Sequence, residues 1–245
     1  MPSITTDVAE DLRFALAWLE RHGSRSGREG MARYGVSSEK AFGVSMANIQ
    51  VLGKRLGRNH ELAAALWATD RYEARMLTAF VDEPERVTGA QMDRWCRDFD
   101  NWAIVDTLCF HLFDRTAAAW SRVEPWSAKS GEFARRAGFA LLWALALHDK
   151  TSGDAPFLRG LRLIEKVAGD ERNFVKKAVN MALGAVGRRS PALHAASVSL
   201  ARRLAESPDA TRRWIGKGAF RELTSPRIAG KFAKHAGSKR TKQAR

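Results

Sequence analysis

The residues best suited to chemistry lie in the stretch QMDRWCRDFDNWAIVDTLCFHLF, which spans residues 91–113 and places Trp102 four residues before Asp106. On a helix, side chains at this spacing share a face, with their Cβ atoms roughly 5–6 Å apart. A carboxylate beside an indole could stabilise a developing positive charge and could orient or deprotonate a water molecule. The structural alternative is that Asp106 caps a neighbouring helix or pairs with an arginine, while Trp102 lies at the rim of the core.

A helical wheel at 100° per residue separates this pair from the apolar side of the segment. The expected core stripe consists of Ile104, Val105, Leu108, Cys109 and Leu112. Trp102, Asp106 and Phe113 fall together on the flank of this stripe. The pattern therefore predicts that the candidate pair lies at the edge of the core.

No other stretch has the spacing of a known catalytic motif. The sequence has no Gly-rich phosphate loop, nucleophile elbow or HExxH motif. Its six histidines are scattered, and we expect them to be surface or packing residues: His22, His60, His111, His148, His194 and His235. Cys96 and Cys109 lie among apolar residues, which is typical of small core residues in a reducing compartment. We therefore expect no metal and no cofactor.

The composition indicates a partner with negative charge. The chain has 245 residues, of which 45% are hydrophobic, so it can form one large domain or two small ones. Its formal net charge of +14 favours polyanions, with nucleic acid first and an anionic membrane surface second. The first 20 residues predict an amphipathic helix rather than a signal peptide, and no apolar run could span a membrane. We expect a soluble cytoplasmic protein.

Hydrophobic residues recur with helical period along almost the whole chain, and no alternating strand pattern is present. The predicted helices cover residues 4–22, 27–34, 38–56, 59–69, 70–81, 88–98, 101–114, 116–123, 130–148, 154–168, 172–187, 191–206 and 209–222. The connections between them are short, which favours antiparallel neighbours in an all-α fold. We expect one domain over residues 1–225.

Two features of the second half suggest a helical repeat with a positive surface. Phe133-Ala-Arg-Arg-Ala matches Phe174-Val-Lys-Lys-Ala, a weak repeat that suits a HEAT-like solenoid, although two amphipathic helices can also look alike by chance. Dibasic pairs recur at Arg135-Arg136, Lys176-Lys177, Arg188-Arg189, Arg202-Arg203 and Arg212-Arg213. On equivalent faces of successive repeats they would form a strip that follows a phosphate backbone. The alternative is an ordinary solvated face.

The last 20 residues, 226–245, contain seven basic residues and no acidic one. They include few large apolar side chains, so we expect a flexible basic tail. Such a tail would serve either as a non-specific DNA-binding arm or only to keep the protein soluble.

Several runs resemble the AlkD-like DNA alkylation repair family, which consists of HEAT-like repeat DNA glycosylases. They are ARYGV (32–36), AFGVSM (41–46), ELAAALW (61–67), YEARMLTAFVDEPERVT (72–88), the WxxxD of Trp102 and Asp106, and FVKKAVNMAL (174–183). Their order extends over about residues 31–189. The resemblance implies a right-handed superhelical solenoid of antiparallel HEAT-like helix pairs that cups double-stranded DNA on its concave face. It also implies excision of N3- and N7-alkylated purines without a metal, by a monomer associated with the nucleoid.

The resemblance also assigns residues. It places the family's catalytic aspartate at Asp106, an active-site tryptophan at Trp102 and an arginine close to the lesion and backbone at Arg136. A second active-site tryptophan falls on Met181, which would contact the sugar, and a further arginine falls on Gly184. We expect contacts with the DNA backbone from Arg135, Arg136, Lys176, Lys177, Arg188 and Arg189.

Three functions remain open on the sequence. The favoured one is a glycosylase, because Trp102 and Asp106 are retained. The second is a non-catalytic protein that binds duplex or branched DNA, as Met181 and Gly184 suggest. The third is a solenoid that binds other proteins.

Overall fold

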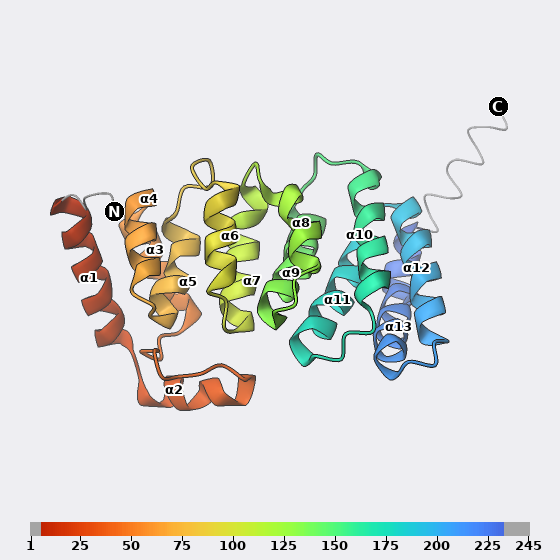
Figure 1. The fold of residues 1–245 in the computed structure, drawn as a ribbon, viewed down its shortest axis with the longest axis horizontal. Coiled ribbons are helices and arrows are strands. Elements are labelled where there is room, and N and C mark those ends of the chain that lie inside the picture. The colour runs from red at the N-terminus through yellow and green to blue at the C-terminus, as the bar shows by residue number, and fades with distance from the viewer. Residues whose placement is uncertain (1–5, 233–245) are drawn as a thin grey trace. The chain divides into compact units, whose positions relative to one another are not determined.

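The computed structural model describes residues 6–232 of the chain (Figure 1). Within these residues the secondary structure is helical and contains no strand. The chain divides into two compact units, Met1–Ala119 and Trp120–Arg245. The prediction of an all-α fold is confirmed, whereas the prediction of one domain over residues 1–225 stays a prediction.

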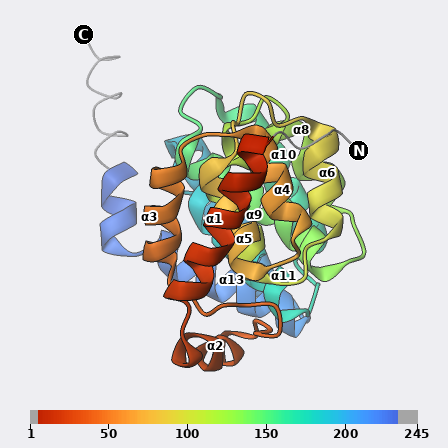
Figure 2. The same cartoon turned by 90° about the vertical axis from the view of Figure 1, so that its left-hand side faces the viewer.

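The first unit contains seven α-helices and two short 3₁₀ helices among its described residues. They are α1 (Thr6–His22), α2 (Arg25–Met31), η1 (Ala32–Tyr34), α3 (Met46–Leu56), α4 (His60–Ala68), α5 (Tyr72–Val81), α6 (Gly89–Arg97), α7 (Trp102–His111) and η2 (Phe113–Arg115). Helix α5 packs against α3, α4 and α7. Figures 1 and 2 both show α2 set apart from α1 and α3, at the lower edge of this unit.

Polar residues in the loops define where these helices begin. The side chains of Ser45, Asn59, Thr88 and Asn101 each accept a hydrogen bond from a backbone N–H three residues later, at the start of α3, α4, α6 and α7. Such caps satisfy an N–H group that has no partner inside the helix. Local sequence therefore fixes these boundaries, including that of the helix which carries the candidate pair.

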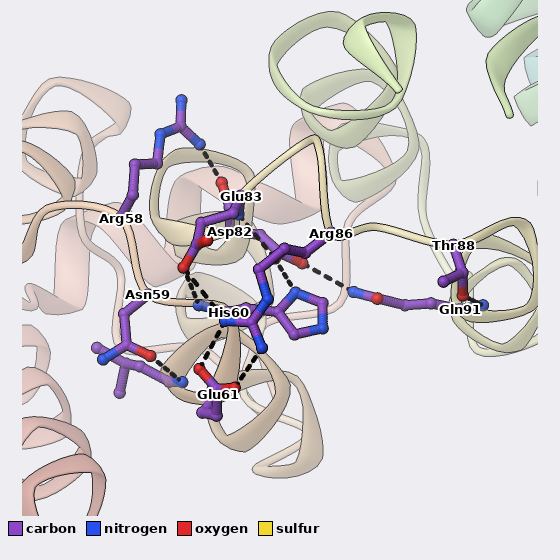
Figure 3. A network of polar contacts seen from close by, with 10 residues as sticks. Arg58, Asn59, His60, Glu61, Asp82, Glu83, Arg86, Thr88 and Gln91 are labelled. Atoms are coloured by element: carbon purple, nitrogen blue, oxygen red, sulfur yellow. Dashed lines mark hydrogen bonds and ion pairs between the residues drawn. The ribbon is translucent and has the colours of Figure 1, made fainter. Parts of the chain in front are cut away.

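A buried polar network joins α4, the α5–α6 loop and α6 (Figure 3). The Asp82 side chain is fully buried and accepts hydrogen bonds from His60 Nδ1 at 2.6 Å and Gln91 Nε2 at 2.8 Å. Arg58 donates to the backbone carbonyl of Asp82. Because a buried carboxylate without partners is costly, these bonds hold three consecutive elements in one arrangement.

The second unit consists of antiparallel helix pairs. Its helices are α8 (Ala119–Ser127, whose first residue ends the first unit), α9 (Glu132–His148), α10 (Asp154–Val167), α11 (Asn173–Val186), α12 (Pro191–Ala205) and α13 (Ala210–Leu223). The closest packing joins α9 to α11 and α12 to α13, and α11 also packs on α13. The rings of Phe133 and Phe174, the aromatic residues of the two similar sequence runs, lie 5.5 Å apart. Equivalent positions of the repeat therefore stack on each other.

The predicted helix over residues 38–56 is wrong in its first part, because α3 begins only at Met46. The chain before it is held by Glu73, a fully buried residue of α5. The Glu73 carboxylate accepts hydrogen bonds from the backbone N–H groups of Phe42, Gly43 and Val44. Gly43 has a φ of 83°, which a helix does not allow. A contact from 30 residues away thus overrides the local helical pattern.

The predicted helix over residues 116–123 also has the wrong end, because α8 continues through Pro125 to Ser127. A proline removes one backbone donor, but here it lies in the last turn, next to the fully buried Trp126. The Ser127 hydroxyl donates to the Glu124 carbonyl at 2.8 Å. Helix α9 packs so closely here that a Cβ added at Gly138 would lie 2.4 Å from the Ser127 nitrogen. Packing therefore keeps the last turn helical.

The beginning of the predicted tail is ordered. Residues 226–232 are helical, and Ile228 is buried. The rest of the predicted tail, residues 233–245, lies outside the described residues.

Candidate active site

Helix α7 presents the candidate pair at its start. Asn101 caps the helix by accepting a hydrogen bond from the Ile104 N–H at 3.0 Å. Trp102 is the first residue of the helix, and Asp106 lies one turn further. The cap thus fixes the direction in which α7 leaves the loop, and with it the face shared by the indole and the carboxylate.

The burial pattern of α7 agrees with the helical wheel. Ile104, Val105 and Leu108 are at most 2% exposed, whereas Trp102 and Asp106 are half-buried. The prediction fails for Phe113, which lies beyond the end of α7, in η2, and is fully buried near the Trp95 ring. The helix ends at His111, so the wheel cannot be extended to residue 113. The pair at the flank is therefore Trp102 and Asp106.

A distant segment orients the indole. The Nε1–H of Trp102 donates to the backbone carbonyl of Tyr34 at 2.8 Å. Tyr34 ends η1, and neither α2 nor η1 contains a buried residue. This hydrogen bond is thus one of the contacts that hold the α2–η1 segment beside α7. It fixes one edge of the indole ring.

A small pocket of about 200 Å³ lies at the start of α7. Its lining includes Ser37, Glu39, Lys40, Asp70, Tyr72, Arg75, Asp100, Asn101 and Ile104. Asp70 has a φ of 57° and forms ion pairs with Lys40 and Arg75. Burial, helped by the charges of Glu73 and Asp100, raises the pKa of Tyr72 to about 12, so its hydroxyl is neutral at physiological pH. No sequence pattern predicts this cluster, because its members come from separate loops and helices.

In the second unit, the predicted lesion-contacting arginine is buried. Arg136 is 5% exposed, and its Nη1 donates to the Phe174 carbonyl at 2.6 Å, which links α9 to α11. Its neighbour Arg135 forms an ion pair with Asp170 at 2.7 Å and donates to the Lys129 carbonyl. Both guanidinium groups therefore join parts of the second unit to each other. Their role at DNA stays a prediction.

The pair at the end of α11 also contacts its own chain. Arg189 donates to the Ala146 carbonyl at 2.9 Å, at the C-terminal end of α9, and its guanidinium lies 3.8 Å from the centre of the Phe157 ring. Burial lowers the pKa of Arg189 from its usual value. Arg188 forms an ion pair with Glu222 of α13. These arginines thus bind carbonyl and carboxylate groups of their own unit.

Among the predicted contacts with the DNA backbone, Lys177 of α11 is the most accessible. Lys177 is exposed, and the Lys176 ammonium lies 5.7 Å from the centre of the Trp214 ring. Met181 is 40% exposed on the same helix. A Cβ added at Gly184 would lie 2.7 Å from a carboxylate oxygen of Glu222, so a longer side chain there would require the flexible Glu222 side chain to move. The two departures from the family pattern thus lie on the same helix as the most exposed predicted contact.

Among residues 6–232, no group of three or more His, Cys, Asp or Glu side chains is placed to hold a metal ion. Cys96 and Cys109 are both buried, as predicted. Within the same part of the chain, no helix is both long and apolar enough to cross a membrane.

A comparison with solved structures identifies the fold class of the protein. A solved structure described as "a new family of proteins related to the HEAT-like repeat DNA glycosylases with affinity for branched DNA structures" superposes with a TM-score of 0.71 at 20% sequence identity. The match covers 84% of this chain and 93% of that chain, so the protein described here has the HEAT-like repeat fold. A search of curated protein sequences finds no match.

The family follows from the sequence match. Residues 15–219 match the family model described as "DNA alkylation repair enzyme". The chain therefore belongs to the DNA alkylation repair enzyme family.

Proposed function

We propose that the protein is a DNA glycosylase that excises cationic N3- and N7-alkylated purines from double-stranded DNA. The observation that carries the proposal is the half-buried pair of Trp102 and Asp106, one turn apart at the start of α7, in a chain of this family. Asp106 provides the carboxylate that the reaction needs. Trp102 provides an aromatic face whose orientation is set by Tyr34.

The chemistry requires few groups because the substrate is activated by its own charge. An alkylated purine carries a positive charge, so it leaves as a neutral base when the bond between C1′ and the base nitrogen breaks and the nitrogen takes the electron pair. The positive charge that develops on the deoxyribose is stabilised by the Asp106 carboxylate. The oxygen of a water molecule then bonds to C1′, and its proton passes to Asp106 or to solvent. The Trp102 ring attracts the cationic base through its π face.

Electrostatic attraction accounts for the choice of DNA as the substrate. The net charge of +14 draws the protein to a polyanion in a manner that does not depend on sequence. The exposed Lys177 on α11 is a candidate phosphate contact. We propose that the protein acts as a monomer in the cytoplasm, associated with the nucleoid.

The test is an assay for free base. Duplex DNA that contains 7-methylguanine is incubated with the wild-type protein and with the variant Asp106→Asn, and the released base is quantified. We expect release by the wild type and a loss of at least about 100-fold in Asp106→Asn, because the amide carries no charge to stabilise the sugar cation. Undamaged duplex binding serves as the control and should be retained.

Equal release by wild type and Asp106→Asn, or no release above background by the wild type, would reject the glycosylase. In the second case the alternative function gains support. A non-catalytic protein that binds duplex or branched DNA is favoured by two residues of α11: the thioether of Met181 lacks a π face, and Gly184 is covered by Glu222. That protein would bind DNA tightly at low salt and leave the glycosidic bond intact.

A further inference from the structure

Helices α11 and α13 meet along a line of matched positions. Each helix contributes residues four apart, so successive contacts stack one turn above the next. The facing residues are Lys176 with Trp214, Asn180 with Gly218, and Gly184 with Glu222. Small or flexible side chains thus meet large ones along the whole contact, and the indole of Trp214 lies at one end of it.

Trp214 is unusually accessible for a tryptophan. All eight tryptophans lie in the described part of the chain, and Trp214 is the most exposed of them, at 48%. Four others, including Trp67 and Trp95, are at most 8% exposed. Exposed indoles are concentrated at binding surfaces, because the ring offers a large rigid contact area.

Positive charges surround this ring. Lys217 and Arg221 follow Trp214 at spacings of three and seven residues, so they share its face of α13, and both are exposed. The Lys176 ammonium lies next to the ring, and Lys177 is exposed on α11. The carboxylate of this contact line, Glu222, forms an ion pair with Arg188. The surface around Trp214 is therefore aromatic and cationic.

We propose that this surface, formed by Lys176, Lys177, Met181, Trp214, Lys217 and Arg221, binds DNA in which bases are unpaired. An aromatic ring among lysines matches the way proteins bind single strands, in which a base stacks on the ring and cations contact the backbone. A continuous duplex buries its base faces in the stack, whereas a gap, a fork or a flipped base exposes one. Met181, 40% exposed, adds a polarizable side chain on the neighbouring helix. The inference rests on the proposed function only in that DNA is the partner.

The charge of this surface argues against association with a second copy of the chain. Two identical surfaces would bring four cationic side chains against four others, which is unfavourable without a polyanion between them. A strand of DNA supplies one negative charge per nucleotide and neutralises them. The occupant that the surface fits is thus a nucleic-acid strand with an accessible base.

The experiment compares two DNA molecules that differ only in pairing. A continuous duplex and the same duplex with a three-nucleotide single-stranded gap are labelled, and dissociation constants of the full-length protein are measured at one salt concentration. We expect tighter binding of the gapped DNA by the wild type. Trp214→Ala should weaken gapped-DNA binding about tenfold and change duplex binding less than twofold, because stacking on one base is lost. Trp214→Phe should retain most of the preference.

Leu158→Ala provides the matched control, because Leu158 is a 38% exposed apolar residue on α10 of the same unit. It should leave both constants unchanged, and circular dichroism should show the same helix content for all variants. Equal affinity of the wild type for the two DNAs, an equal loss on both in Trp214→Ala, or a dimer that depends on Trp214 would overturn the inference. The release of 7-methylguanine is a separate measurement that does not depend on these binding constants. A failure of this inference is therefore distinct from a failure of the proposed function.

Discussion

Trp102 combines two roles that can be separated by substitution. Its ring lies at the flank of the buried stripe of α7, and its N–H bonds to the Tyr34 carbonyl, 68 residues earlier in the chain. The ring face is the part that would attract a cationic base, whereas the N–H holds the orientation of the ring. Replacement by alanine removes both, and replacement by phenylalanine removes only the hydrogen bond.

We expect Trp102→Ala to lower the rate of 7-methylguanine release by about 10-fold or more, because a cation–π contact in a partly dry site contributes on the order of 2 kcal/mol. Trp102→Phe should lose less, since it keeps an aromatic face. Duplex affinity should change little in either variant, because phosphate contacts provide most of the binding. Single-turnover kinetics and a binding titration measure the two quantities. A loss of affinity as large as the loss of rate would contradict the role assigned to the ring.

The structure shows the surroundings of residue 184, one of the two departures from the family pattern. The Glu222 carboxylate lies beside Gly184 and is paired with Arg188, which follows the end of α11. An arginine at position 184 would have to displace that ion pair. The guanidinium that the resemblance leads us to expect here is absent, and that of Arg188, four residues later, is paired with Glu222.

At the scale of elements, the α10–α11 loop is tied to α9 by a carboxylate between two arginines. Asp170 accepts hydrogen bonds from Arg172 and from Arg135 of α9, and its side chain is 7% exposed. Arg172, with Arg135 second, lowers the pKa of Asp170 from its usual 3.8 to about 2. The ionised form is therefore favoured in the folded protein relative to the unfolded chain.

The consequence is a dependence of stability on pH. A lowered pKa contributes stability above the unfolded value near pH 4, and this contribution is lost as the pH falls toward 2. We expect Asp170→Asn to reduce the free energy of unfolding by about 2 kcal/mol at pH 7 and by less at pH 3. Urea titrations at both pH values measure this difference. Glu206→Gln, at an exposed position after α12, is the control and should have little effect. An identical loss at the two pH values would contradict the assignment.

The pKa of Asp82 is shifted in the opposite direction from that of Asp170. Burial raises the pKa of this carboxyl, although the hydrogen bond with His60 acts against the increase (Figure 3). A raised pKa disfavours the ionised form in the folded protein, so the intrinsic contribution of this group falls as the pH rises through its titration range. The bonds to His60 and Gln91 offset this cost and maintain the junction of α4 with α6.

At the scale of the whole molecule, net charge determines how binding responds to salt. The excess of 14 positive charges predicts a steep loss of DNA affinity as the salt concentration rises, because counterions are released from the phosphates. The predicted contacts are not equivalent, however. Four of the six are arginines that contact their own chain, whereas Lys177 is exposed.

We therefore expect Lys177→Glu to weaken binding to all duplex sequences alike and to reduce the slope of log affinity against log salt by about 1. Arg162→Glu makes the same change of charge at an exposed position of α10 and should reduce the slope less. Fluorescence anisotropy over a range of salt concentrations provides the slopes. A slope that is unchanged in Lys177→Glu would place the phosphate contacts elsewhere. The charge reversal Arg136→Glu is a poorer test, because it would bury a carboxylate between α9 and α11.

The sequence by itself determined most of the helices, the caps at their starts and the side of α7 that is buried. These features depend on contacts within one or two turns, so the period of the apolar residues and the loop residues such as Asn101 are enough to predict them. The pair of Trp102 and Asp106 was found for the same reason, since both members lie on one helix.

Only the tertiary structure decided the partners of charged and polar groups. Three examples are the bond from Trp102 to Tyr34, the bonds from the loop before α3 to Glu73, and the bond from Arg136 to the Phe174 carbonyl. All of them join residues at least 29 positions apart. The sequence shows that a side chain is charged, but its partner depends on which distant groups the packed helices bring within hydrogen-bonding distance. Where such a group is buried, as Glu73 and Arg136 are, the bond is also costly to lose.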